Sequence, residues 1–190
     1  MPRPIPSPLP PEPIKLTIDE YLELPNDGKR YEILEGELFV TPAAIPKHQK
    51  VSRKLQVILM RALEDTGLGE VYNAPIDVVL DDYNIVQPDL LFIRSERLKI
   101  VGPKNIQGAP DLVVEIFSPS TRRTDVLVKS GVYARFGIPS YWMVDPDLDR
   151  IEFYRLEEGA YRLKATVSSP EVAEPLEFPG MRIPLKEVFG

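Results

Sequence analysis

The chain has 190 residues, of which 43 % are apolar and 27 % charged. This is ordinary for a folded globular protein with a sizeable core and excludes general disorder. No uncharged apolar stretch approaches the roughly eighteen residues of a membrane-spanning helix, and the first residues lack the apolar segment of a signal peptide. The absence of cysteine excludes disulfides and thiolate metal sites. A net charge of −6 argues against a non-specific nucleic-acid coat protein. We therefore expect a cytoplasmic protein that does not associate with membranes.

Proline marks the beginning of the chain. Residues 1–14 contain seven prolines, a composition typical of an extended arm with polyproline character. After this arm we find no linker and no internal repeat, so residues 15–190 are expected to form a single domain.

The first elements are a short helix, a hairpin and a long helix. Thr17 and Glu20 have the spacing of a capping box, and the helix that they open must end before Pro25. Residues 31–40 alternate as a hairpin that turns at Glu35-Gly36. Residues 47–66 are predicted to be a helix that ends at Gly67. Its apolar positions recur at helical spacing and form one stripe: Val51, Leu55, Ile58, Leu59 and Ala62.

The remaining elements predict a mixed α/β sheet. Short runs rich in β-branched residues are typical of buried strands: residues 71–80, 85–93, 111–117 and 140–145. A second helix is expected over residues 123–136, and hairpin strands over 150–156 and 160–167.

Two carboxylates stand in apolar surroundings. Asp89 follows Pro88 inside the expected strand 85–93, and Glu115 lies in the middle of the expected strand 111–117. A lone buried carboxylate is costly, whereas two on neighbouring strands can share a hard divalent cation. Alternatively, one carboxylate bonds backbone amides at a strand end and the other lies exposed on an edge.

Lys129 and His48 are further candidates. Lys129 lies four residues after Asp125, so the two form either an ordinary surface ion pair or part of a site in which the ammonium stabilises developing negative charge. His48, the only histidine, stands in the first turn of the long helix. Motifs of serine hydrolases, dinucleotide enzymes and P-loop NTPases are absent.

These features occur in a recognisable order along the chain. YEILEGEL is followed by a histidine that opens a helix, then by QPDLLFI, PDLVVEIFSPSTRRTD and GIPSYWMVDP. Over residues 16–190 this succession resembles the Uma-type restriction endonucleases of the PD-(D/E)XK nuclease superfamily. The resemblance implies an α/β, restriction-endonuclease-like core, in which helices flank a central mixed β-sheet, with an N-terminal hairpin and C-terminal hairpin strands. It also implies phosphodiester cleavage that depends on Mg²⁺, with Mn²⁺ as a substitute.

The resemblance also assigns roles to residues. Asp89 belongs to the PD element and Glu115 is the acidic residue of the next core strand, so both are expected metal ligands and catalytic residues. Phe117 stands where a lysine is expected, and Lys129 is the catalytic lysine displaced onto the following helix. His48 stands where many relatives carry a helix-borne glutamate and completes the expected catalytic set.

Several polar residues are candidates for nucleic-acid binding. Hydroxyl and guanidinium groups directly after Glu115 are suited to phosphate oxygens: Ser118, Ser120, Arg122 and Arg123. Alternatively, Ser120 or Thr121 caps the next helix. Lys50 and Lys54 lie on the basic face of the long helix.

Three acidic residues outside the core motif are weaker candidates. Glu32 and Glu37 either close over the site or form a solvated strand face. Asp77 is a candidate for a supporting contact.

The sequence therefore predicts a Mg²⁺-dependent endonuclease that acts on DNA as a homodimer, because two symmetric sites suit cleavage of both strands. The alternatives are a nuclease-fold binding or assembly module with weak or lost catalysis, and a hydrolase of smaller phosphoesters.

Overall fold

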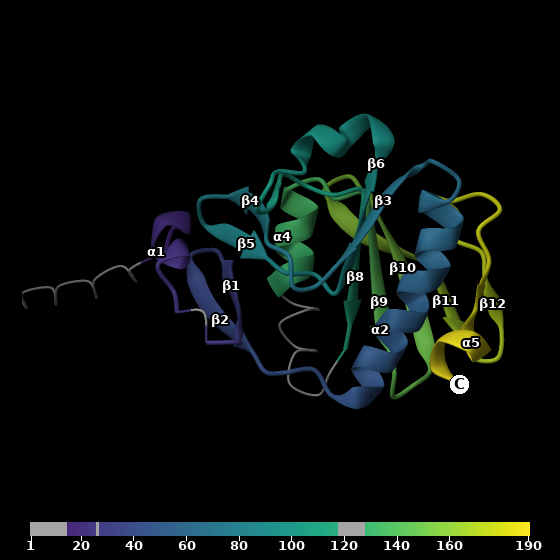
Figure 1. Ribbon diagram of the computed structural model, residues 1–190. Helices are drawn as coiled ribbons and strands as arrows, with labels where there is room; N and C mark the ends of the chain where they lie inside the picture. Colours follow the sequence, from purple (N-terminus) through teal and green to yellow (C-terminus); the bar gives the residue numbers. More distant parts are fainter. Residues whose placement is uncertain (1–14, 26, 118–127) are drawn as a thin grey trace, which may run out of the picture.

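A computed structural model of the protein describes residues 15–25, 27–117 and 128–190. Its largest element is a six-stranded sheet with the strand order β11-β10-β9-β8-β6-β3 (Figure 1). Its strands are β3 (Gly69–Asn73), β6 (Leu90–Arg94), β8 (Leu112–Ile116), β9 (Ser140–Asp145), β10 (Arg150–Glu157) and β11 (Ala160–Ser168). The sheet is mixed, because β8 and β9 are parallel whereas the other neighbours are antiparallel.

A second, five-stranded sheet has the order β2-β1-β5-β4-β7 and lies beside the first (Figure 1). Its strands are β1 (Arg30–Leu34), β2 (Glu37–Thr41), β4 (Val78–Asp81), β5 (Asn84–Val86) and β7 (Ile106–Gln107). The hairpin β1–β2 turns at Glu35 and Gly36, both at positive φ, as predicted. Pairing of β1 with β5 brings this hairpin against the strand that leads into β6.

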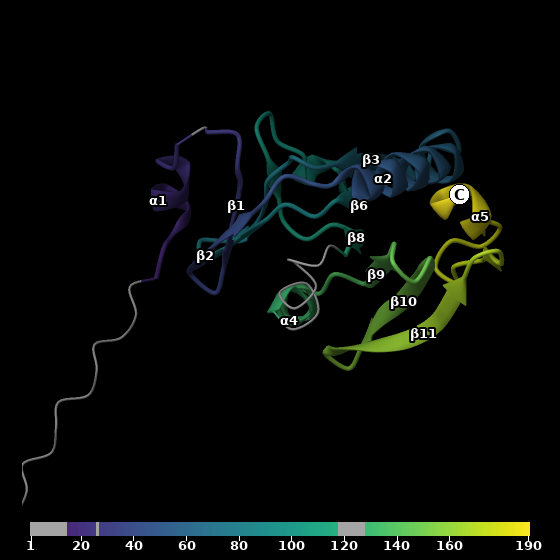
Figure 2. The ribbon, with the colours of Figure 1, turned by 90° about the horizontal axis from the view of Figure 1, so that it is seen from below.

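Helices cover both faces of the six-stranded sheet. The helices that pack on it are α2 (Pro46–Leu59), which continues into the π-helical turn η1 (Met60–Glu64), the 3₁₀ helix η2 (Ser95–Ile100), α4 (Ser130–Arg135) and α5 (Leu185–Phe189). The short helix α1 (Ile18–Leu22) lies instead at the second sheet, where the Ile18 N–H donates to the carbonyl oxygen of Asp82. Figures 1 and 2 place α2 and α4 on opposite sides of β8 and β9. A short pair, β12 (Val172–Ala173) with β13 (Ile183–Pro184), precedes α5. No helix among the described residues is long and apolar enough to cross a membrane.

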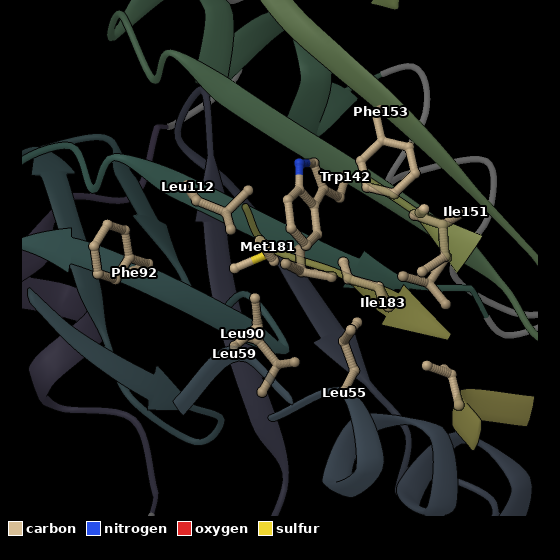
Figure 3. Packing of buried hydrophobic residues seen from close by; sticks show 14 of the residues in the cluster. Leu55, Leu59, Leu90, Phe92, Leu112, Trp142, Ile151, Phe153, Met181 and Ile183 are labelled. Carbon is tan, nitrogen blue, oxygen red and sulfur yellow. The ribbon is translucent and has the colours of Figure 1, made fainter. Parts of the chain in front are cut away.

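Alternation along the strands divides the core in two. Even-numbered residues of β6, β8 and β9 pack with Val51, Leu55 and Leu59 of α2. Odd-numbered residues of the same strands pack with Val132 and Tyr133 of α4. Figure 3 shows the first of these clusters, in which Leu55 and Leu59 lie below Leu90 and Trp142. The apolar stripe of the long helix is therefore confirmed as the face that covers the sheet.

Two of the predicted strands are too long, because each extends across a proline that divides the observed strands. The expected strand 71–80 is divided at Pro75 into β3 and β4, which belong to different sheets. The expected strand 85–93 is divided at Pro88 into β5 and β6. Proline has no N–H to donate to a ladder and is excluded from central strand positions, so the chain leaves one sheet and enters the other at these points.

Other predicted elements are confirmed with shifted ends. Thr17 N–H donates to Glu20 Oε2 at 2.7 Å and α1 follows directly. The long helix ends as a π-helical turn, followed by Gly67 at φ 74°. The strands predicted over 140–145, 150–156 and 160–167 are β9, β10 and β11. The arm 1–14 and most of the first part of the expected helix 123–136 lie outside the described residues, and α4 is its described remainder.

Candidate functional site

Asp89 lies directly before β6 rather than within a strand, which corrects the sequence-based placement. The residue is only 6 % exposed, and its side chain accepts hydrogen bonds from three directions. Ile116 N–H donates to Oδ2 at 2.9 Å, His48 Nε2 lies 3.0 Å from the same oxygen, and Arg30 Nη1 donates to Oδ1 at 3.1 Å. One carboxylate therefore joins β1, α2 and β8.

These partners keep Asp89 charged. Burial alone would raise the pKa of Asp89, but the hydrogen bond and charge of His48, the charge of Arg30 and the N–H of Ile116 outweigh it. The pKa of Asp89 is consequently below its usual value, as expected where donors favour the charged form. The carboxylate is ionised at neutral pH and able to bind a cation.

Glu115 is the second buried carboxylate and lies within a strand, as predicted, at the position before the last residue of β8. It is 2 % exposed. Its Oε1 accepts from Lys129 Nζ at 3.1 Å and from the Tyr133 hydroxyl at 2.6 Å. Burial, together with the charges of Glu115 and Glu32, raises the pKa of Tyr133 well above its usual value. Tyr133 therefore remains a donor to Glu115.

Lys129 points into the protein rather than to solvent. Its Nζ lies 3.0 Å from Glu32 Oε1 as well as 3.1 Å from Glu115 Oε1, and the residue is 4 % exposed. Phe117, at the position of the expected lysine, is buried in the cluster beneath α4. The ammonium therefore contacts Glu115, one of the two carboxylates, Asp89 and Glu115, toward which we expect it to point, while its catalytic role stays a prediction. Asp125, the alternative partner, lies outside the described residues.

The two carboxylates lie on adjoining segments of the sheet. Leu90 pairs with Val114 in the antiparallel β6–β8 ladder, and Asp89 and Glu115 are the next residues in each direction. Arg30 lies close enough to Asp89 and Glu115 for the negative charges of both carboxylates to raise its pKa. Burial lowers the pKa of Arg30, but the charges of Asp89, Glu32 and Glu115 outweigh burial and raise it.

The second sheet supplies the support for this site. Gln87, between β5 and β6, donates its N–H to Glu32 Oε1 at 2.7 Å and accepts from Arg30 Nη2 through its carbonyl oxygen. Its side-chain amide donates to Asp77 Oδ1 at 2.8 Å, and the Tyr21 hydroxyl donates to the same oxygen at 2.7 Å. These contacts hold the segment between β5 and β6, which carries Asp89, in place. They also agree with the supporting position predicted for Asp77.

Three residues of the site were missed or undervalued from sequence. The sequence did not decide whether Glu32 and Glu37 close over the site or form a solvated strand face. Glu32 is buried against Lys129, whereas Glu37 is exposed. Tyr133 lies four residues after Lys129, a spacing that places both on one helix face and was available as a signal. Arg30 carries no such signal, because only the pairing of two distant strands brings it to Asp89.

The predicted nucleic-acid contacts are only partly described. Lys50 is exposed on α2, and Lys54 on the same helix donates to the carbonyl oxygen of Gly190 at 2.5 Å. The other predicted contacts lie outside the described residues: Ser118, Ser120, Arg122 and Arg123.

The donor chemistry fits Mg²⁺. Carboxylate oxygens are its preferred protein ligands, and Mg²⁺ is usually held by one or two of them together with waters. Asp89 and Glu115 supply such a pair. Among residues 15–25, 27–117 and 128–190, no three His, Asp or Glu side chains form a metal-binding group.

Comparison with known proteins gives the family and supports the fold. The family model described as Uma2, "Putative restriction endonuclease", matches residues 18–186. The crystal structure of "a putative nuclease belonging to DUF820" from Anabaena variabilis is similar, with a TM-score of 0.76 and 20 % sequence identity over 92 % of this chain and 97 % of that one. No curated protein matches the chain. The fold is therefore restriction-endonuclease-like, and the chain belongs to the Uma2 family.

Proposed function

We propose that the protein is a metal-dependent endonuclease that hydrolyses phosphodiester bonds of DNA with Mg²⁺, for which Mn²⁺ can substitute. The family description and the nuclease fold of the similar structure support a nuclease. The observation that carries the proposal is the burial of Asp89 and Glu115 on adjoining segments, with the Lys129 ammonium on Glu115.

Asp89 and Glu115 would hold the ion. Bound there, Mg²⁺ would neutralise charge on the scissile phosphate and lower the pKa of water. Lys129 presents a compact positive charge at the same place, suited to negative charge that develops on the phosphate in the transition state. His48 positions Asp89 through its 3.0 Å contact, and Tyr133 positions Glu115 through its hydroxyl.

The charge of α2 supports a nucleic-acid substrate. The sequence from Lys47 to Arg61 contains five basic residues and no acidic one, and Lys50 and Arg53 are exposed. His48 on the same helix contacts Asp89, so the basic helix begins at the site. Cations in this position would bind the phosphate backbone without regard to sequence.

A plasmid-cleavage assay tests the proposal. We expect the purified protein with Mg²⁺ to convert supercoiled DNA to nicked or linear forms, and Asp89→Asn and Glu115→Gln each to reduce the rate at least 100-fold. Glu37→Gln, an exposed change in the hairpin, is the matched control and should cleave normally. Circular dichroism establishes that each variant is folded. Cleavage by both site variants at the wild-type rate would refute the assignment.

Two further arms test the rest of the proposal. RNA of the same sequence tests whether the substrate class is DNA, which should be cut faster. Light scattering at micromolar concentration tests the predicted homodimer, which we propose because paired sites suit the cutting of both strands. A protein that binds DNA but never cleaves it would be the nuclease-fold binding module instead.

A further inference from the structure

A cavity of about 330 Å³ lies beside Asp89, on the α2 side of the site. Its walls come from the segment before α2, from the exposed side of α2 and from the end of β3, and its lining includes Arg30, His48 and Asp89. The proposed ligand role of Asp89 uses the carboxylate alone and leaves the cavity itself without a function.

The size and lining of this cavity suit a small planar ligand. Ligand sites generally measure about 300–1,000 Å³, so this one has room for a single nucleotide unit and not for a duplex. Ala43, Ala44, Ala74 and Pro75 give it apolar walls, while polar side chains line the rest. Nine of the fourteen lining residues are polar or charged, so the four apolar residues can contact the faces of a ring while the polar ones bond its edge and an attached phosphate.

The amide of Gln56 is held in a defined orientation at this cavity. Its Nε2 donates to Asn73 Oδ1 at 3.0 Å, and Asn73 Nδ2 in turn donates to the carbonyl oxygen of Ala74 at 2.9 Å. This chain fixes which end of each amide carries nitrogen. Gln56 retains one N–H and its Oε1, for which the described part of the chain shows no partner.

A glutamine amide that offers one acceptor and one donor side by side matches adenine, which presents an amino donor beside a ring-nitrogen acceptor. We propose that this cavity binds one unstacked adenine base of the substrate strand, with Gln56 reading the base and Asn73 positioning Gln56. The inference rests on the proposed function, because it takes the strand in the cavity to be the one whose phosphate lies at Asp89.

Binding measurements test this without cleavage. The probes are fluorescein-labelled 12-residue oligo(dT) strands with one central dA, dG or dC, and Ca²⁺ replaces Mg²⁺. We expect the dA strand to bind about tenfold more tightly than oligo(dT), in line with the discrimination of one bidentate amide–base contact. Equal affinity of the wild type for all four strands overturns the proposal, as does a failure to bind any of them.

Three variants distinguish the role of Gln56, which contacts the base, from that of Asn73, which positions Gln56. Gln56→Leu should abolish the preference for dA and leave the affinity for oligo(dT) within twofold. Gln56→Glu removes the N–H groups that face the base and Asn73 Oδ1, so it should abolish the preference for dA as Gln56→Leu does. Asn73→Ala should reduce the preference for dA without creating another.

Controls distinguish the two proposals and the two sources of adenine. Gln107→Leu, an exposed glutamine of β7, should retain the full preference; a preference that survives in all Gln56 and Asn73 variants overturns the inference. If free dAMP competes as well as the dA strand, the cavity is a nucleotide site and the strand assignment is wrong. If the wild type prefers the dA strand but does not cleave DNA, only the proposed nuclease function is contradicted. If it cleaves DNA but shows no preference for dA, only the inference about this cavity is contradicted.

Discussion

Asp89 and Glu115 are almost equally buried, at 6 % and 2 % exposure, but their charges are balanced differently. Asp89 has its own guanidinium, Arg30, together with His48 and a backbone N–H. Glu115 shares one ammonium, Lys129, with a second buried carboxylate, Glu32.

The difference indicates how the site accommodates cations. We call Glu115, Glu32 and Lys129 the Glu115 half of the site, and Asp89, Arg30 and His48 the Asp89 half. Among the described side chains, the Glu115 half contains two carboxylates and one ammonium, whereas the Asp89 half contains one carboxylate and one guanidinium. Buried like charges are unfavourable unless a cation lies between them. The Glu115 half therefore depends strongly on Lys129, and in the Asp89 half a bound metal would compete with Arg30 for the carboxylate.

The largest effect should follow from removal of Lys129. Lys129→Met leaves Glu32 and Glu115 buried together without their shared cation, and loss of one partner of a buried ion pair typically costs about 3–5 kcal/mol. We expect a loss of this size in the free energy of unfolding, measured by denaturant titration. Lys164→Met, which removes a surface contact with Glu157, should cost less than about 1 kcal/mol.

The double variant Lys129→Met/Glu32→Gln sharpens this prediction. If shared charge is the reason for the loss, removal of one carboxylate should restore part of the stability. An additive loss in the double variant would contradict the comparison of the two halves.

Arg30 provides the corresponding test of the Asp89 half. Its guanidinium occupies Oδ1 of Asp89, so Arg30→Gln should make the carboxylate more available to Mg²⁺. We expect the affinity for Mg²⁺ to rise about tenfold, which corresponds to about 1.4 kcal/mol, as measured by calorimetry. Arg97→Gln, which breaks a comparable contact with Asp111 at 2.8 Å, should leave the affinity unchanged. A weaker affinity in Arg30→Gln would mean that Arg30 supports the ion rather than competing with it.

The sequence identified the two carboxylates because charge inside an apolar run is costly and therefore conspicuous. The long helix and the strands of the six-stranded sheet were predictable for a related reason, since their periodicity is local. The position of Lys129 followed from the family resemblance and not from spacing, which by itself favoured a surface pair with Asp125.

The partners from the second sheet could not be predicted in this way. Arg30 and Glu32 reach the site because Ile33 pairs with Ile85, a contact between strands about fifty residues apart in the chain. No local pattern encodes that pairing. The break at Pro88, which sends β5 and β6 into different sheets, was the feature from which the second sheet could have been inferred.

Tyr133 tests the Glu115 half without a change of charge. Tyr133→Phe removes the 2.6 Å hydrogen bond to Glu115 Oε1 and keeps the ring in its contact with Tyr141. A hydrogen bond to a charged group contributes about 1.5–3 kcal/mol, and Lys129 remains as a partner, so we expect a loss near the lower value in denaturant titration. Tyr161→Phe, whose hydroxyl donates to a neutral backbone carbonyl of Ile138, is the matched control and should cost less.

The smallest effect should be the dependence of stability on pH through Asp89. The pKa of this carboxyl is lowered on folding, so the folded state binds its proton less readily than the unfolded chain does. A group with a depressed folded pKa stabilises the protein fully above its unfolded pKa, near 3.8, and this contribution is lost as the pH falls through the folded pKa. In EDTA, the stability advantage of the wild type over Asp89→Asn should be constant between about pH 5 and 7 and should shrink below about pH 4. An advantage that instead grew on acidification would require a raised pKa. It would show that burial, rather than Arg30 and His48, governs the charge of Asp89.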